Sequence, residues 1–84
     1  DAQQRYVDLR LVLYLENPTD YNFIQTETPK IVDDYQAFIR NLTIEDLSGS
    51  EGWYRLKEEL LIRTNKILEP RRVAEVLISK MVIQ

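Results

Sequence analysis

The alternation of apolar and polar side chains near the N-terminus predicts a β-strand. Between Val7 and Leu15 every odd-numbered position is Val or Leu, whereas the even-numbered positions include Asp8 and Arg10. Side chains of a strand point alternately to its two faces, so this period of two places one apolar row on a buried face. The strand ends in residues 16–20, because proline cannot donate a ladder hydrogen bond and Asn and Asp favour turns.

A helix is predicted from the spacing of the next apolar residues. Thr28 and Pro29 have the order of a helix start, with a hydroxyl at the N-cap and proline at the first helical position. Tyr21 and Phe23 then fall in a connecting segment. The apolar residues that follow recur three and four positions apart and define one buried face: Ile31, Val32, Tyr35, Phe38, Ile39 and Leu42.

A short helical turn and a second long helix are expected next. Thr43 followed by two acidic residues is typical of a helix N-terminus, and the turn should run through Leu47. Ser50 is a suitable cap for a helix over residues 51–68, which ends before Pro70 because the residue before a proline is pushed out of the α region. Its inner face carries Trp53, Leu56, Leu60, Leu61, Thr64, Ile67 and Leu68, whereas Ile62 alone points away from the core.

Residues 73–83 predict a second strand, with β-branched side chains at both odd and even positions, as in a strand covered on both faces. The expected fold is therefore a small α+β domain, strand–helix–helix–strand, with the helices packed on one face of a small sheet. Two strands alone are marginally stable in water. We expect either a third strand upstream or a sheet completed by another copy of the chain.

Composition limits both the size and the chemistry of the domain. With 84 residues, 44% of them hydrophobic, the chain suits one domain with one modest core. It contains no cysteine and no histidine, which excludes thiol nucleophiles, Ser-His-Asp triads and histidine- or cysteine-based zinc sites. Its net charge is -3 and its 11 basic residues are scattered, which argues against nucleic acid as a partner.

From the start of the sequence we expect the chain to be a piece of a longer protein. The chain begins with Asp rather than Met, and no run of about 18 apolar residues is present. We expect any membrane-spanning or targeting segment to lie upstream.

Adjacent carboxylates are the main candidates for chemistry, at Asp33-Asp34, Glu45-Asp46 and Glu58-Glu59. Neighbours on a helix point about 100° apart and do not share a site. Asp34 is expected to pair with Lys30, and Glu59 with Arg63, at four-residue spacing. These pairs therefore read as solvated helix faces, and we predict no catalytic, cofactor-binding or metal-binding residues.

Four apolar residues stand where the local period calls for polar ones. Tyr6, Val12 and Tyr14 lie on the nominally outer face of the first strand, and Ile62 lies on the outer side of the last helix. Exposed apolar patches usually mark protein interaction surfaces. We predict that these residues form a protein interface; the alternative is that an upstream segment covers the sheet face.

Several segments together resemble the carboxyl half of FliL, the flagellar basal-body-associated protein family. They are Arg5-Tyr6-Val7-Asp8-Leu9, Thr43-Ile44-Glu45-Asp46-Leu47, Ser50-Glu51-Gly52, Leu56-Lys57, Asn65-Lys66-Ile67-Leu68 and the ending Val82-Ile83-Gln84. The resemblance covers nearly the whole chain, from about Arg5 to Gln84, although the family's usual preceding strand is missing.

The resemblance implies a single-pass inner-membrane protein whose periplasmic domain comprises residues 1–84. It also implies a fold like the stomatin-type (SPFH) domain, no enzymatic activity, and assembly into a ring around the stator, MotA and MotB or their sodium-driven equivalents, in support of torque and of swimming or swarming. The transmembrane helix and the first strand would lie upstream. An alternative function is a small regulatory or ligand-sensing α/β domain; an enzyme that uses only carboxylates and tyrosines is the least favoured.

Overall fold

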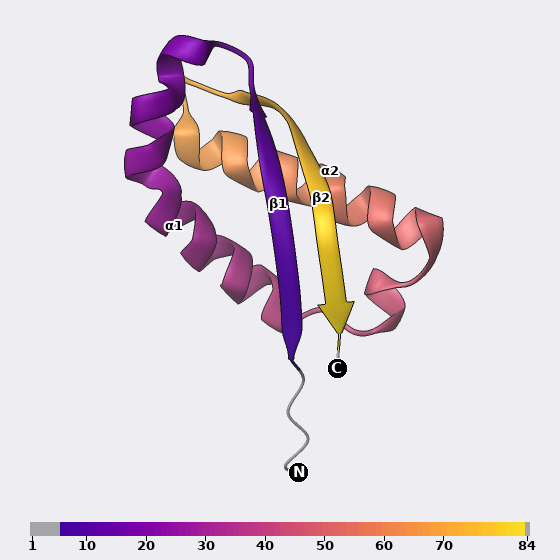
Figure 1. Ribbon diagram of the computed structural model, residues 1–84. Helices are drawn as coiled ribbons and strands as arrows, with labels where there is room; N and C mark the ends of the chain where they lie inside the picture. The colour runs from indigo at the N-terminus through magenta and orange to yellow at the C-terminus, as the bar shows by residue number, and fades with distance from the viewer. Residues whose placement is uncertain (1–5, 84) are drawn as a thin grey trace.

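The computed structural model describes residues 6–83. Two long strands and two long helices make up the domain, in the order strand, helix, helix, strand (Figure 1). Their bounds are β1 Val7–Leu15, α1 Tyr21–Arg40, α2 Gly49–Leu68 and β2 Val73–Ile83, with 3-10 turns η1 Pro18–Asp20 and η2 Glu45–Leu47. The predicted α+β class, the element order and the bounds of both strands are confirmed.

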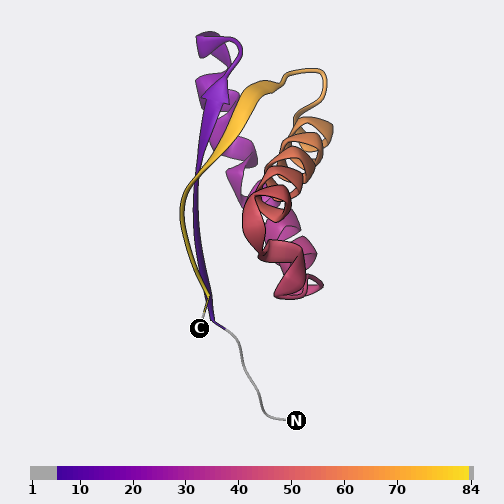
Figure 2. The same cartoon turned by 90° about the vertical axis from the view of Figure 1, so that its right-hand side faces the viewer.

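Strands β1 and β2 pair in antiparallel fashion, and both helices lie on the same side of them (Figure 2). The register shifts twice, between Arg10 and Leu11 and between Tyr14 and Leu15. At each shift β2 contains one extra residue. Because of this extra residue, the β2 side chains beyond the bulge still point to the same face of the sheet as their β1 partners. The β2 residues opposite the inner row of β1 are Val73, Val76, Ile78, Met81 and Ile83.

These bulges explain why apolar residues occupy both parities of β2. The expectation that the strand is covered on both faces is not met within residues 6–83, where the helices cover one face. The inner row is buried at Val73, Val76 and Ile78, whereas Glu75 and Lys80 on the other face are exposed.

The centre of the core lies between α2 and β2. The side chains of Leu60, Leu68 and Val73 have no exposed surface, and Val76 is 1% exposed. Helix α1 packs on α2 and contributes Ile24, Ile31 and Tyr35 to the same cluster. The core is therefore organised around α2.

Helix α1 begins earlier in the chain than predicted. The helix start assigned to Thr28 and Pro29 is therefore wrong. The Asn17 side chain accepts the Thr19 N–H at 3.0 Å and opens η1, which leads directly into α1. Pro29 lies inside the helix, and the Thr28 hydroxyl donates to the Ile24 carbonyl at 2.9 Å instead of capping.

Tertiary contacts explain the early start of α1. An interior proline costs a helix about 3 kcal/mol. The first turns of α1 bury Ile24 and place Phe23 under Arg71, 4.3 Å from the ring centre, while Arg71 also pairs with Asp20 at 3.2 Å. Val32 was assigned to the buried face and is instead 45% exposed, so that face is narrower than predicted.

The turn before α2 is confirmed in outline and corrected in one detail. The Asp46 N–H donates to the Thr43 hydroxyl and the Thr43 N–H donates to the Asp46 carboxylate, a reciprocal pair of caps. Helix α2 then has Ser48, not Ser50, at its N-cap. The backbone of η2 approaches so closely that a Cβ on Gly52 would lie 2.9 Å from the Asp46 carbonyl oxygen.

The position of the core predicts a contrast between two neighbouring α2 residues. Leu60→Ala should lower the free energy of unfolding by about 2–5 kcal/mol, because it leaves a cavity at a fully buried site. Ile62→Ala, two positions away and 60% exposed, should change it by less than about 0.5 kcal/mol. Urea unfolding monitored by circular dichroism would measure both, and equal losses would contradict the assigned orientation of α2.

Candidate functional site

The face of the sheet turned away from the helices carries an apolar surface. We call it the outer sheet face: Asp8, Arg10, Val12 and Tyr14 of β1 with their partners Val82, Lys80, Leu77 and Glu75 of β2. Val12 is 40% exposed and Tyr14 48% exposed. Tyr6, which precedes β1, is also exposed. Three of the four predicted interface residues are thus exposed on or directly beside β1.

Leu77 and Val82 extend this apolar surface onto β2. Val12 lies opposite Leu77 in the ladder, and Val82 lies opposite Asp8. The sequence-based reasoning did not assign them to the interface, since the bulges hide the parity of β2. Positions of the ladder partners, not the period alone, identify them.

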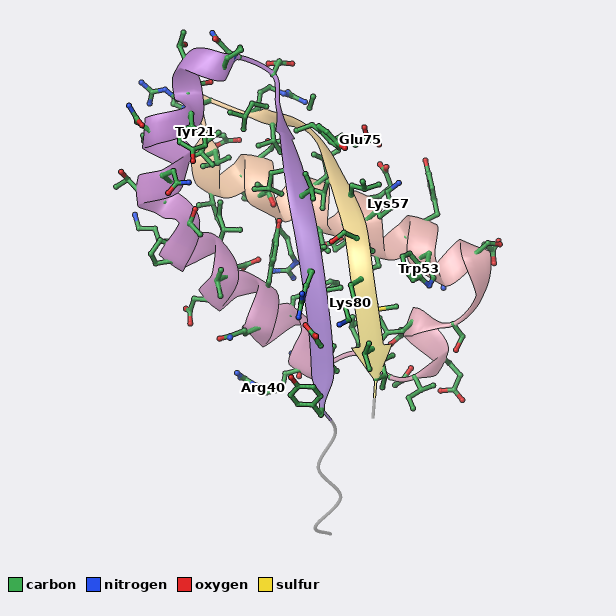
Figure 3. The ribbon with its side chains drawn as sticks, in the orientation of Figure 1. Tyr21, Arg40, Trp53, Lys57, Glu75 and Lys80 are labelled. Atoms are coloured by element: carbon green, nitrogen blue, oxygen red, sulfur yellow. The ribbon has the colours of Figure 1, made fainter. Side chains whose placement is uncertain are left out.

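A small charged cluster interrupts the apolar residues. The Asp8 carboxylate lies 3.4 Å from the Arg10 guanidinium and 3.6 Å from the Lys80 ammonium. Figure 3 shows Lys80 and Glu75 on β2. Two cations against one carboxylate leave the middle of the outer sheet face positively charged, and exposed pairs of this kind add little stability.

The fourth predicted residue, Ile62, lies on a different surface. It is 60% exposed on the side of α2 opposite the core, together with Tyr54, which is 64% exposed. Tyr54 was missed, although its position eight residues before Ile62 places it on the same side of the helix. The predicted interface residues therefore fall on two separate surfaces, one on the sheet and one on α2.

A groove runs between β1 and α1. It is lined by the inner row of β1, Val7, Leu9, Leu11 and Leu13, and by α1 residues that include Ile31, Val32 and Ile39. The inner row of β1 is only half-buried, because α2 lies beneath β2. The polar lining residues Thr28, Gln36 and Arg40 all come from α1, so polar groups do not converge here as in a typical small-molecule pocket.

A buried polar contact joins the two helices. The Thr64 hydroxyl donates to the Leu60 carbonyl at 2.7 Å, so the Tyr35 hydroxyl donates to Thr64 Oγ1. Burial raises the pKa of Tyr35 above its usual value. The contact is structural because both residues are enclosed in the core.

The carboxylates also form structural contacts. Asp34 pairs with Arg63 of α2 at 3.0 Å, not with Lys30 as predicted, because α2 packs beside this face of α1. Lys30 pairs with Glu27 instead, while the predicted pair of Glu59 with Arg63 is confirmed at 3.3 Å.

No metal centre is assembled by the part of the chain that the structure describes. Within residues 6–83, His, Cys, Asp and Glu side chains do not gather in a group of three or more that could hold an ion. Hydrogen bonds from Thr43 lower the pKa of the Asp46 carboxyl, and the bond from the Thr43 backbone N–H has the largest effect. These bonds belong to the capping contact described above. Within the same residues, neither helix is long and apolar enough to cross a membrane.

The fold is that of a small α+β domain with exposed apolar patches. A family model, flagellar basal body-associated protein FliL, matches residues 1–84. The flagellar FliL proteins of two Caulobacter vibrioides strains are each 36% identical to this chain over 83 residues, 99% of its length. The chain therefore belongs to the FliL family.

Family membership places the chain among flagellar basal-body structural proteins, which are connected with motility and are not enzymes. The resemblance noted in the sequence is thereby confirmed. The chain spans 40% of the length of the two Caulobacter relatives. The likeness to the stomatin-type domain stays a prediction.

The buried Tyr35 predicts a stability change at high pH. Because the pKa of Tyr35 is raised in the folded state, folding favours the protonated phenol. The contribution of this phenol to the free energy of unfolding is full below about pH 10, which is the pKa of an unfolded tyrosine. It is lost as the pH rises further. Tyr35→Phe removes this titration, so its unfolding free energy should fall less between pH 9 and pH 11. Parallel urea curves at the two pH values would measure the difference, and identical losses in both proteins would contradict it.

Proposed function

We propose that this domain is the self-associating part of a flagellar motor accessory protein, which forms a homo-oligomeric ring around the stator complex and supports torque, swimming and swarming. The observation that carries the proposal is the exposed apolar surface at Val12 and Tyr14 on the outer sheet face. Family membership supports the flagellar setting. The stator partner is MotA and MotB or their sodium-driven equivalents.

Two separate patches suit a ring. In a ring each copy contacts its neighbours head to tail, so it must offer two different surfaces. The outer sheet face supplies one, with Tyr6, Val12 and Tyr14, and the side of α2 with Ile62 supplies the other. A domain of this size buries a smaller fraction of its chain surface than a larger domain does, so covering such patches adds appreciable stability.

The rest of the protein anchors the domain and completes its sheet. The domain lies in the periplasm, and a single transmembrane helix outside this sequence holds it at the inner membrane. A further strand from outside this sequence pairs with β1 and covers the groove beside α1. The two strands differ in how well their outer edges suit a further strand. Strand β2 is bulged at two places, and bulges protect an edge from pairing. Strand β1 is regular and its inner row is half-buried, so it is the strand that favours a further partner.

The proposal predicts that charge at Tyr14 weakens assembly without unfolding the domain. Tyr14→Glu in the full-length protein should reduce self-association and swimming, because an unpaired charge at an interface core is costly. Its circular dichroism spectrum and melting temperature should stay close to those of the parent. Ile44→Glu is a matched control, since Ile44 is 47% exposed against 48% for Tyr14 and lies in the turn before η2.

Sedimentation velocity in detergent and soft-agar motility would measure the two effects. If Tyr14→Glu unfolds the domain, this face belongs to the core and the interface assignment is wrong. If it assembles and swims like the Ile44→Glu control, the outer sheet face is not the contact surface.

A further inference from the structure

We infer that the outer sheet face of one copy docks onto α2 of the next copy in a fixed register, with Glu58 seated between Arg10 and Lys80. This inference rests on the proposed self-association and specifies which surfaces meet. Three observations carry it: the order of apolar and charged residues on each surface, their spacing, and the opposite placement of the two surfaces.

On α2, the contact surface consists of Tyr54, Glu58 and Ile62. These residues follow one another at intervals of four, so they share one side of the helix and span about 12 Å along its axis. Tyr54 and Ile62 are both more than half exposed. Glu58 is exposed and forms no ion pair with any side chain within residues 6–83. The order on this side is apolar, acidic, apolar.

The outer sheet face has the matching order. Val82 lies at one end opposite Asp8, the ladder pair Arg10 and Lys80 comes next, and Val12 with Leu77 follows. Successive pairs on one face of a strand are about 6.8 Å apart, so the outer two pairs are about 13–14 Å apart. Along β2 the order on this face is apolar, basic, apolar, with nearly the spacing found on α2, whereas the first position on β1 is the acidic Asp8.

Charge complementarity then fixes the register. Asp8 neutralises one of the two nearby cations, at 3.4 Å from Arg10 and 3.6 Å from Lys80, so the cluster keeps a net positive charge. Glu58 supplies the missing negative charge, and the flanking apolar residues cover each other. Two sheet faces meeting about the cluster would oppose like charges, as would two α2 surfaces meeting at Glu58, and like-charge contacts are unfavourable.

The placement of the two surfaces makes the contact repeatable. The outer sheet face looks away from the helices (Figure 2). Tyr54 and Ile62 lie on the side of α2 opposite its buried residues. A copy docked through one surface therefore leaves the other free for a further copy. Such a heterologous contact generates rings when its rotation closes.

Charge reversal tests the register in the full-length protein. Glu58→Lys should weaken self-association about tenfold or more, because it places a third cation against the cluster. The double variant Arg10→Glu, Lys80→Glu should be impaired in the same way. Asp33→Lys, an equal charge change at an exposed α1 position, should assemble like the parent.

Mixing the two impaired proteins should restore assembly. In the mixture, the altered α2 of one protein contacts the altered outer sheet face of the other. The native outer sheet face of the first protein contacts the native α2 of the second. Sedimentation velocity of the mixture, with circular dichroism of each variant as the check on folding, gives the result. Assembly by Glu58→Lys alone at the parent's concentration would overturn the register.

Disulfide trapping provides a measurement in which no charge is reversed, because Glu58→Cys and Lys80→Cys remove one charge of each sign. Glu58→Cys combined with Lys80→Cys should give an intermolecular ladder on mild oxidation, whereas Asp33→Cys with Lys80→Cys should not. A ladder from the control pair alone overturns the inference. If the parent assembles but the 58–80 pair gives no ladder, the register is wrong and the proposed ring stands; if the parent does not self-associate at any concentration, the proposed function itself fails.

Discussion

The packing of α2 against the inner row of β2 is the interaction on which the rest of the structure depends. Leu60 and Leu68 from the helix and Val73 and Val76 from the strand are the most completely buried apolar side chains. Helix α1 adds to this layer through the Tyr35–Thr64 contact and the Asp34–Arg63 ion pair. Because α2 lies beneath β2, the inner row of β1 is left half-buried above a groove.

The same packing explains why the domain has surfaces to offer. One layer of helices covers one face of a sheet, so the other face meets solvent or a partner. On this face Val12, Tyr14 and Leu77 lie to one side of a cluster with excess positive charge. On the far side of the helix layer, Tyr54 and Ile62 flank the Glu58 carboxylate, which forms no ion pair within residues 6–83. A domain built this way has a polarity between its two faces, which head-to-tail assembly requires.

Sequence patterns predict those features that depend on local spacing. The period of two in β1, the α2 face and the turn capped by Thr43 follow from short-range rules, and the structure confirms them. The start of α1 does not follow, because burial of Ile24 and the contact of Phe23 with Arg71 outweigh a proline inside the helix.

Long-range pairing accounts for the remaining differences. Asp34 reaches Arg63 across two helices, a partner that lies outside any helical spacing rule. The two bulges of β2 change which of its residues face outward, so Leu77 and Val82 were not assigned to the surface while Tyr6, Val12 and Tyr14 were. Tyr54 is a different case from Leu77 and Val82, because its spacing from Ile62 along the helix indicates from the sequence alone that the two residues lie on the same side.

In the proposed ring, the outer sheet face becomes covered when copies of the protein assemble. Hydroxyl-radical footprinting of the full-length protein, below and above the concentration at which it self-associates, tests this most directly. We expect Tyr14, Leu77 and Tyr54 to lose reactivity on assembly, while the exposed Ile44 keeps it. Unchanged reactivity of Tyr14 in the assembled protein would show that the outer sheet face is not a contact surface.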